Sequence, residues 1–496
     1  MTQFIHRYHQ HDARLYHLQS PLPVANPTLV HLNTELLMML SLPDTLDWQT
    51  IISGDLTDLD RHSNGQIKPL AMAYAGHQFG QWAGQLGDGR GLLIGELMSD
   101  KQPTIAELHL KGSGKTPYSR HGDGRAMIGS SVREYLCGHA LHHLGVPSSQ
   151  AIGLVISDTH IHRGTIERAA TLLRVSDCHV RLGHFEWVAM YAPDYFGKFV
   201  DKIIADYYPQ FHRTRTGKRT DVLGFLQQIC ENTAKMIAHW QLVGFSHGVM
   251  NTDNLNITGS TLDFGPFGFM EAFEPTWINN ASDHTARYCY QNQPTIGHYN
   301  LAVSLQHFYQ LGIKHTELTA LLDHYENTLL AHYHQGLADK LTLDNPESPT
   351  TQKLCYEFLE ILQKYQLDYT NSFRSLSYYL DNTDNHSHEY RLAMQIQNQL
   401  DDNAKLELNQ WLCAWKNAIN KPKAQAITQL NSINPVYVLR NHLAQYAIEC
   451  VQNGDFQEVD RLYRLLKNPY QFHDFATQKD TDSLSVEQNP IVSCLS

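Results

Sequence analysis

Apolar residues recur along the chain with two different periods, and the period changes before the middle of the chain. Between residues 70 and 190 glycines are frequent and short apolar runs predict strands; residues 107–111 alternate between polar and apolar positions, as a half-buried strand does. From about residue 191 the apolar spacing becomes helical, and residues 300–470 are almost entirely helical in pattern. This order predicts an α+β fold in which a strand-rich part precedes a helical part.

Two helices and one hairpin can be bounded from the pattern. Residues 127–144 carry apolar side chains at helical spacing, and Gly145 and Pro147 end that helix. Residues 222–243 form a second amphipathic helix. The dipeptide at 259–260 separates two short apolar runs, at 255–257 and 261–263, which predicts a β-hairpin.

The same patterns divide the chain into four parts. Residues 1–65 are expected to form an N-terminal arm packed on the body, and residues 66–190 a glycine-rich lobe. Residues 191–475 are expected to form a helical lobe, and the polar residues 476–496 a mobile tail. Two lobes of different composition predict a ligand cleft between them.

Composition excludes several classes of protein. Of the 496 residues 42% are hydrophobic and 18% are charged, which provides for a large core and excludes a disordered chain. No apolar run approaches the roughly 18 residues of a membrane-spanning helix, and the first residues lack the apolar core of a signal peptide, so we expect a cytoplasmic protein with no membrane partner. The net charge, 38 − 50 = −12, argues against a nucleic-acid partner.

The eight cysteines and 30 histidines form no recognisable metal motif. No two cysteines are spaced as CxxC, and no HExxH string occurs. Most of the cysteines are expected to be buried as small apolar side chains. Cys494, in the polar tail, is the exception.

Two glycine-containing strings suggest phosphate binding, and the first fails on spacing. Residues 112–116 (GSGKT) look like the end of a P-loop, but the glycine that the motif requires would fall at His109. Residues 84–91 (GQLGDGRG) lead into a predicted strand. Glycines there let the backbone turn and bring its N–H groups to an anion, although an ordinary glycine-rich hairpin has the same composition.

Kinase-like chemistry is indicated first by a lysine and a glutamate. Lys111 lies on the alternating strand and Glu134 lies in the next helix, which is the order of the kinase lysine that contacts ATP phosphates and the glutamate that holds it. A surface lysine and an unrelated glutamate would give the same pair of positions, so this pair needs support from elsewhere in the chain.

That support comes from the segment between residues 247 and 265. His247, Asn254 and Asp263 fall in register with the motifs H-x-D-x-x-x-x-N and DFG, in which the asparagine and the last aspartate hold magnesium. The position of the usual base is Val249, which cannot accept a proton, and Asp253 lies beside the asparagine instead. Three elements in the correct order are far more specific than a lone DFG.

Basic residues cluster locally in this acidic chain. One group lies at positions 111–133 and comprises Lys111, Lys115, Arg120, Arg125 and Arg133; a second comprises Arg163, Arg168, Arg174 and Arg181. Such clusters favour a phosphate pocket over a nucleic-acid surface. Solvated surface positions remain the alternative for Arg120, Arg125, Arg163 and Arg168.

Longer strings make the chain resemble the selenoprotein O family of protein adenylyltransferases, which were once called pseudokinases. The strings are YAGHQFG at 74–80, QLGDGR at 85–90, LKGSG at 110–114, TPYSR at 116–120, DGRA at 123–126, HGVMNTDN at 247–254, DFGPFGF at 263–269, NQP at 292–294 and VSC at 492–494. They are specific and extend over almost the whole chain.

The resemblance implies a fold, a reaction and a set of site residues. The fold would be two-lobed and protein-kinase-like, with a nucleotide-binding N-lobe and an enlarged helical C-lobe that carries the catalytic and metal loops. ATP would bind flipped, with its γ-phosphate inward, and a Ser, Thr or Tyr hydroxyl of a protein substrate would take AMP from it with release of pyrophosphate. The implied ATP contacts are Gly87, Gly89, Arg90, Lys111, Asp123, Gly124, Arg174, Arg181 and Asp263. Glu134 would pair with Lys111, Asp253 would be the general base, and Asn254 and Asp263 would hold Mg²⁺ or Mn²⁺.

The chain departs from the family at its proposed redox pair. Members often have a cysteine in the loop after DFG that pairs with a C-terminal cysteine or selenocysteine. Here the loop position is Asn279, while Cys494 has the place of the selenocysteine. Cys289 lies further along the same loop and is a possible substitute partner.

Two other functions compete with adenylyl transfer. A conventional protein kinase is disfavoured by Val249. A catalytically inactive nucleotide-binding scaffold is disfavoured because Lys111, Asp253, Asn254 and Asp263 are all present, and an inactive site has no need of the metal ligands.

Overall fold

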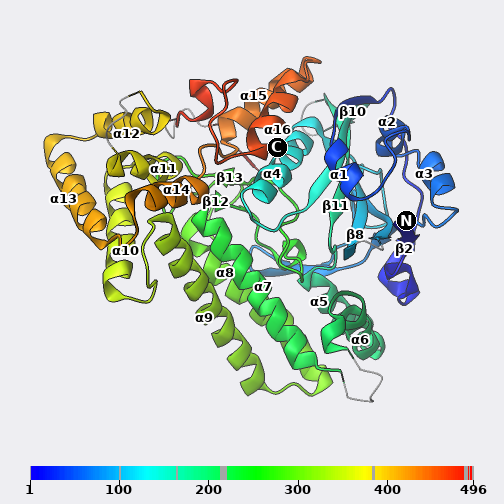
Figure 1. Cartoon of the computed structure of the whole chain (residues 1–496). Coiled ribbons are helices and arrows are strands. Elements are labelled where there is room, and N and C mark those ends of the chain that lie inside the picture. The colour runs from blue at the N-terminus through cyan, green and yellow to red at the C-terminus, as the bar shows by residue number, and fades with distance from the viewer. Residues whose placement is uncertain are drawn as a thin grey trace.

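The computed structural model describes residues 2–99, 102–162, 166–212, 220–381, 386–484, 490 and 492–493. Arg163 and Cys494, which entered the sequence argument, lie outside these residues. Within them, no helix is both long and apolar enough to cross a membrane. The fold is mixed, with a large antiparallel sheet followed by a long helical region, as Figure 1 shows.

The sheet has nine strands among the described residues. Its main path runs β2 (Tyr16–Leu18), β4 (Leu70–Met72), β7 (Gly91–Ser99), β8 (Gln102–Lys111), β11 (Ile166–Ser176), β10 (Gln150–His162) and β3 (Thr28–Leu32), with β1 (Thr2–Ile5) on β7 and β9 (Ala126–Met127) on β11. The strands predicted near 92–94 and 107–111 are therefore β7 and β8. Residues 1–65 add three strands to the sheet and supply α1 (Thr34–Met39), α2 (Trp48–Ser53) and α3 (Thr57–His62).

Alternation along β8 gives the two faces of the sheet different characters. Leu108 and Leu110 are fully buried in the apolar cluster beneath α1, α2 and α3. The intervening residues Glu107, His109 and Lys111 point to the opposite face, because successive side chains of a strand alternate. Three polar residues at alternate positions are thus directed into the body of the protein, where each is at most 5% exposed.

Helix α4 (Ile128–His143) covers the polar face of the sheet and packs on β10 and β11. It confirms the helix predicted over 127–144, and Gly145 follows it with a φ of +81°, a left-handed conformation that glycine adopts readily. Nearly every residue of α4 is buried, including Arg133 and Glu134. An amphipathic pattern is consequently weak in this helix, since it is enclosed on several sides.

The remaining helices form the second half of the molecule. They are α5 (Leu182–Tyr191), α6 (Phe196–Tyr207), α7 (Val222–Leu242), α8 (Gln293–Leu305), α9 (His315–Lys340), α10 (Pro349–Lys364), α11 (Tyr369–Leu380), α12 (His388–Gln399), α13 (Asp402–Ala418), α14 (Lys423–Ile433), α15 (Asn441–Gln452) and α16 (Gln457–Lys467). Helix α7 confirms the helix predicted over 222–243 and packs on α8 and α9. The chain then returns, so that α15 and α16 pack on α4 (Figure 1).

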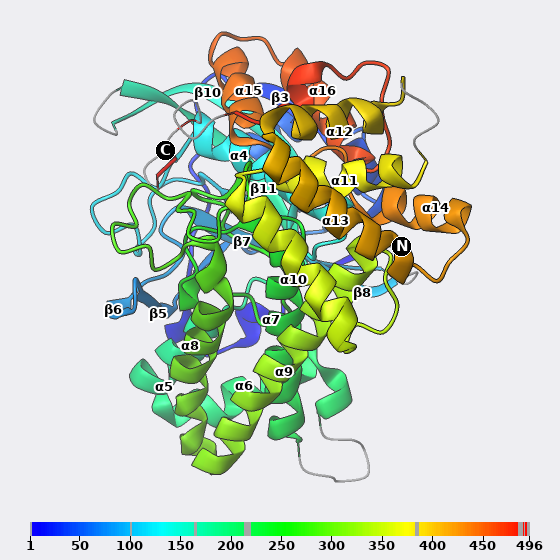
Figure 2. The same ribbon diagram turned by 90° about the vertical axis from the view of Figure 1, so that its left-hand side faces the viewer.

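The predicted hairpin at residues 255–263 is wrong in its extent. Leu255 and Thr261 form a single antiparallel bridge, and Thr261 also pairs with Ser148 while Asn256 pairs with Arg181. The backbone of this segment therefore pairs with distant residues of the chain instead of forming a local hairpin. Short strands nearby are instead β12 (Phe245–Ser246) with β13 (Gly268–Phe269), and β5 (Ala75–Gln78) with β6 (Gln81–Gln85); Figure 2 shows the latter hairpin projecting from the body.

Candidate active site

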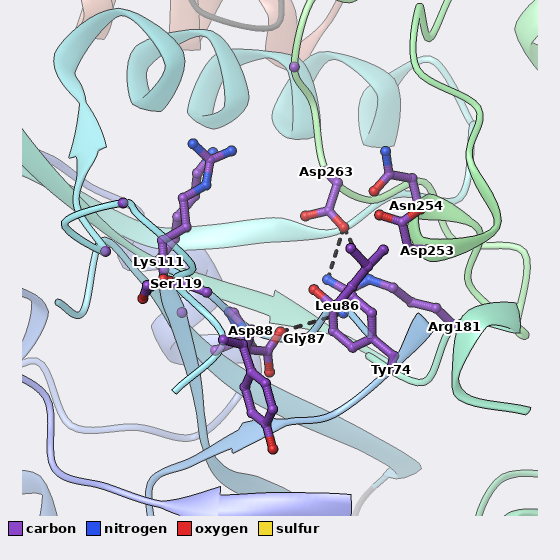
Figure 3. A pocket seen from close by; sticks show the side chains of 18 of the residues that line it. Tyr74, Leu86, Gly87, Asp88, Lys111, Ser119, Arg181, Asp253, Asn254 and Asp263 are labelled. Carbon is purple, nitrogen blue, oxygen red and sulfur yellow. Dashed lines mark hydrogen bonds and ion pairs between the residues drawn. The ribbon is translucent and has the colours of Figure 1, made fainter. Parts of the chain in front are cut away.

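A cavity of about 470 Å³ lies where β7, β8, β11 and the loop after α7 meet. Of the predicted site residues it is lined by Gly87, Gly89, Arg90, Lys111, Gly124, Arg174, Arg181, Asp253, Asn254 and Asp263. Asp123 lies next to its wall, between the lining residues Gly122 and Gly124, and Glu134 lies behind Lys111. Residues far apart in sequence thus converge on one cavity (Figure 3).

Lys111 and Glu134 form the predicted ion pair. Lys111 ends β8 and Glu134 projects from α4, and both side chains are almost completely buried. Burial lowers the pKa of Lys111 despite this partner. Glu134 also accepts a hydrogen bond of 2.8 Å from Nε of Arg174. Burial alone would raise the pKa of Glu134, but Arg174 and Lys111 together lower it, so Glu134 holds both cations as a carboxylate.

Asp263 is held by two arginines. Its Oδ1 accepts a hydrogen bond from Nη2 of Arg174 at 3.0 Å, and its Oδ2 accepts from Nε and Nη2 of Arg181 at 3.1 and 2.9 Å. Burial would raise the pKa of this carboxyl, but Arg181 and Arg174 hold the pKa well below its usual range. The backbone at Asp263 has a φ of +60°, a left-handed conformation that is uncommon for a residue other than glycine.

Asp253 occupies a different electrostatic environment in the same cavity. It is 8% exposed, its Oδ2 accepts a hydrogen bond of 2.9 Å from Nε2 of Gln78, and its Oδ1 has no hydrogen-bond partner among the described residues. Burial raises its pKa to about 6. A Cβ at Gly76 would lie 2.7 Å from Oδ1 of Asp253, so the first strand of the β5–β6 hairpin needs glycine to approach this carboxylate.

Asn254 is oriented by the backbone of its own loop. Its Nδ2 donates a hydrogen bond of 2.9 Å to the carbonyl of Val249. The amide nitrogen is used in this contact, so the amide oxygen is the atom that can ligate a cation. No group of three or more His, Cys, Asp and Glu residues in the described parts of the chain could hold a metal by itself. Magnesium commonly takes one or two protein oxygens together with phosphate oxygens and water, which suits a pair such as Asn254 and Asp263.

Two glycines of the lining loops are required by close packing. Gly87 has a φ of +146°, and a Cβ there would lie 2.4 Å from the ring of Tyr118. Gly124 has a φ of +73°, and a Cβ there would lie 2.2 Å from the backbone of Gly114. The loop at 112–125 therefore folds back on itself and against the loop at 86–90, and together they form one wall of the cavity.

Sequence reasoning missed several residues that line the cavity. Asp88, inside the glycine-rich string, is buried and accepts a hydrogen bond of 3.0 Å from the backbone N–H of Met72. Tyr74 also lines the cavity, and the guanidinium of the predicted residue Arg181 lies 4.7 Å from its ring centroid in a cation–π contact. His109 and Gln78 also line the cavity. The alternating pattern of β8 was a signal for His109, since it places His109 on the same face as Lys111.

The segment around the expected redox position is well packed. Asn279 donates a hydrogen bond of 2.9 Å to the carbonyl of Ser246, and Cys289 is buried and forms no disulfide with another described residue. The backbone N–H of Ala281 donates to the carbonyl of Val492 at 2.8 Å, so part of the C-terminal segment lies against this loop. The pairing of Cys494 stays a prediction, because that residue is outside the described residues.

A comparison with known protein families finds one match over nearly the whole chain. The matching family model is described as "Protein adenylyltransferase SelO", and it covers residues 2–467. The matched range contains every residue that lines the cavity.

Proposed function

The chain belongs to the protein adenylyltransferase SelO family, and on that premise we propose that the cavity is its active site. Family membership makes the protein a nucleotidyltransferase that uses ATP and modifies protein substrates. The proposal concerns where and how this occurs: ATP binds between the sheet and the loop at 247–265, and Asp253 activates the acceptor hydroxyl. It also takes the fold to be protein-kinase-like and two-lobed, with residues 66–190 and 191–475 as the lobes.

The observation that carries the proposal is the convergence of a kinase-like set of side chains in one cavity. Lys111 on a strand is paired with Glu134 on the following helix, and Asp263 lies within ion-pair distance of Arg174, which also binds Glu134. A chain of ion pairs thus connects Lys111 on the sheet to Asp263, a candidate metal ligand. Cations that are buried and already gathered in the cavity reduce the reorganisation that binding of a triphosphate requires, and such preorganisation is the main contribution to phosphoryl-type transfer.

The residues present fit a bound divalent cation. Asp263 has an ionised carboxylate and Asn254 has an amide oxygen, and both line the cavity. A cation held there supplies charge neutralisation on the phosphates. Because Asp263 is bound to Arg174 and Arg181 in this structure, phosphate oxygens that attract the two guanidinium groups would release the carboxylate for the metal.

Asp253 is suited to accept the proton of the acceptor. The hydroxyl oxygen bonds to the α-phosphorus while the bond from that phosphorus to the bridging oxygen of the β-phosphate breaks, and pyrophosphate leaves. The hydroxyl proton goes to Oδ1 of Asp253, which has no other partner among the described residues. Its pKa of about 6 leaves it ionised at neutral pH yet basic enough to take a proton in the transition state.

Transfer from isotopically labelled ATP tests the proposal. The full chain is incubated with a mixture of soluble proteins, Mg²⁺ and ATP that carries the label on either the α- or the γ-phosphate. Incorporation of the α-label alone is expected. Incorporation of the γ-label alone would mean a kinase, which Val249 at the usual base position opposes, and absence of both labels would mean an inactive nucleotide-binding scaffold.

A matched variant connects the result to this cavity. Lys111→Ala should lower ATP affinity and α-label transfer together, because it removes a phosphate contact and leaves Glu134 without one of its two cations. Full transfer by a well-folded Lys111→Ala protein would show that the reaction occurs elsewhere.

A further inference from the structure

The β5–β6 hairpin presents an unpaired strand beside the cavity. Among the described residues β6 pairs with β5 alone, and Figure 2 shows the two strands projecting from the body. Every residue of β6 is exposed except Gly84, which is half-buried. Proteins usually protect such an edge with charged residues, a proline or a covering element, but β6 contains no proline and no charged residue. An edge of this kind is suited to pair with another polypeptide.

The hairpin differs in charge from the other walls of the cavity. Residues 74–87 contain no Asp, Glu, Lys or Arg. The other walls carry four cationic side chains, which are Arg90, Lys111, Arg174 and Arg181. Cations match the phosphates of ATP, whereas an uncharged strand matches a neutral length of polypeptide. The two substrates of the reaction are thus expected on different walls.

Exposed aromatic side chains accompany the unpaired strand. Phe79 and Trp82 are each 39% exposed, and Tyr191, at the end of α5, is 46% exposed. The ring of Trp82 lies 5.3 Å from that of His77 across the strand pair. A Cβ at Gly84 would lie 3.9 Å from the hydroxyl oxygen of Tyr191, which places this tyrosine beside β6. Aromatic residues supply much of the binding energy at protein interfaces.

The inner strand of the hairpin is attached to the loop that carries the proposed base. The backbone N–H of His77 donates a hydrogen bond of 2.8 Å to Oγ1 of Thr252, and Gln78 binds Asp253 from the same strand. The edge of β5 that faces away from β6 is therefore occupied by the loop at 251–253. A polypeptide that binds to β6 is consequently held at a fixed distance from Asp253.

We propose that β6, with Trp82 and Tyr191 beside it, binds an extended, uncharged segment of the protein substrate as a third strand; this inference rests on the proposed function. Neighbouring strands lie about 4.8 Å apart, so the added strand would lie about 10 Å from β5. An extended chain advances about 3.3 Å per residue, which puts the acceptor hydroxyl about three residues beyond the paired segment. Because backbone pairing supplies much of the affinity, proteins of different sequence could be acceptors.

Two variants of the full chain test the surface. Trp82→Ser and Tyr191→Ser remove one aromatic side chain each, from two different elements. The control is Leu406→Ser, which removes another exposed apolar side chain, on α13 at a distance from the sheet (Figure 1). With a mixture of soluble proteins below saturation, each aromatic variant should lower the initial rate of α-label transfer about tenfold, the effect of losing one interface anchor. The control should transfer at the wild-type rate, and calorimetry should show ATP affinity within about twofold of the wild type in all three.

A competing peptide tests the strand pairing. The peptide has eight residues, alternating Val and Gln, and lacks hydroxyl groups, so it can occupy β6 without accepting AMP. It is used unmodified, with N-methyl groups on every Val, or with N-methyl groups on every Gln. Alternate residues of a strand direct their N–H groups to the same neighbour. The unmodified peptide and one methylated form should therefore inhibit transfer, and the other form should inhibit about tenfold less.

The contrary outcomes are distinct. Wild-type transfer by both aromatic variants, an equal loss of ATP affinity and transfer, or equal inhibition by the two methylated peptides would each overturn the proposal. So would a wild type that light scattering shows to be a dimer and a Trp82→Ser protein that is a monomer, because a second copy of the chain would then cover β6. A wild type that binds no ATP, or that transfers no α-label to any protein, would instead contradict the proposed function itself.

Discussion

Two carboxylates of the same cavity have different partners: Asp253 is hydrogen-bonded by the amide of Gln78, whereas Asp263 is bound by the guanidinium groups of Arg174 and Arg181. The two carboxyls start from the same intrinsic acidity. Burial raises the pKa of Asp253 to about 6, and the two arginines overcome burial and hold the pKa of Asp263 well below its usual range. The difference shows how the segment at 247–265 supplies both a base and a permanent anion to one cavity.

The largest effect is expected from removing the permanent anion. Asp263→Asn should lower α-label transfer by about a thousandfold or more, because the cation that it helps to hold supplies several kcal/mol of charge stabilisation. The matched control is Asp194→Asn, the same change at an exposed carboxylate that pairs with Arg14, which should leave transfer unchanged. Comparable activities of the two variants, with both folded, would remove Asp263 from the metal site.

A smaller but still large effect is expected at the base. Asp253→Asn should lower the transfer rate by about a hundredfold or more, as is usual for a lost general base, while ATP affinity changes only a few-fold. Adding Val249→Asp to that variant should not restore activity, because the carboxylate would return at a position suited to a different phosphorus. Rescue by the added carboxylate in steady-state assays would show that the site works as an ordinary kinase.

The two aspartates should also affect stability in opposite directions. In the presence of a chelator at pH 8, Asp263→Asn should lower the free energy of unfolding by roughly 3–5 kcal/mol, because it leaves two buried arginines without their carboxylate. Asp253→Asn should raise it by about 3 kcal/mol, since the pKa of Asp253 is above that of an unfolded aspartate and burial of its charge costs stability.

The pH dependence of that second effect follows from its sign. A raised pKa means that the wild type loses stability as the pH rises from about 4 to about 6, and the asparagine variant does not. The advantage of Asp253→Asn in thermal unfolding should therefore shrink steadily as the pH falls below 6. An advantage that is equal at pH 4 and pH 8 would show that Asp253 has an ordinary pKa.

The smallest effect is expected at Gln78, which positions Asp253. Its hydrogen bond lowers the pKa of that carboxyl, although burial dominates. Gln78→Leu should move the acidic limb of the kcat/KM profile to higher pH, so that the rate falls several-fold near pH 6 and recovers by about pH 8. A uniform loss at every pH would indicate that Gln78 shapes the cavity rather than tunes the base.

Much of this site could be predicted from the order of residues alone. Kinase-like chemistry is indicated by motifs that are local in sequence. These motifs are Lys111 on an alternating strand, Glu134 in the next helix, and Asn254 and Asp263 at fixed spacing. Periodicity also predicted α4 and α7 to within one residue at each end, since helix formation depends on side chains three and four positions apart. The family assignment from the same strings is confirmed by the match over residues 2–467.

The tertiary structure determines the burial and the charged neighbours of each side chain in the site, and therefore its pKa. The sequence identifies Asp253 and Asp263 as neighbours, but burial and the arrival of Arg174 and Arg181 from β11 and the start of α5 set their opposite acidities. The tertiary structure also brings His109 and Asp88 together, with Nε2 of His109 3.5 Å from Oδ1 of Asp88. In addition, Ser148 and Arg181 pair with the backbone of residues 255–263, which leaves a single bridge where a hairpin was predicted. Desolvation and charge pairing depend on distances between residues far apart in the chain, and local sequence patterns carry no information about those distances.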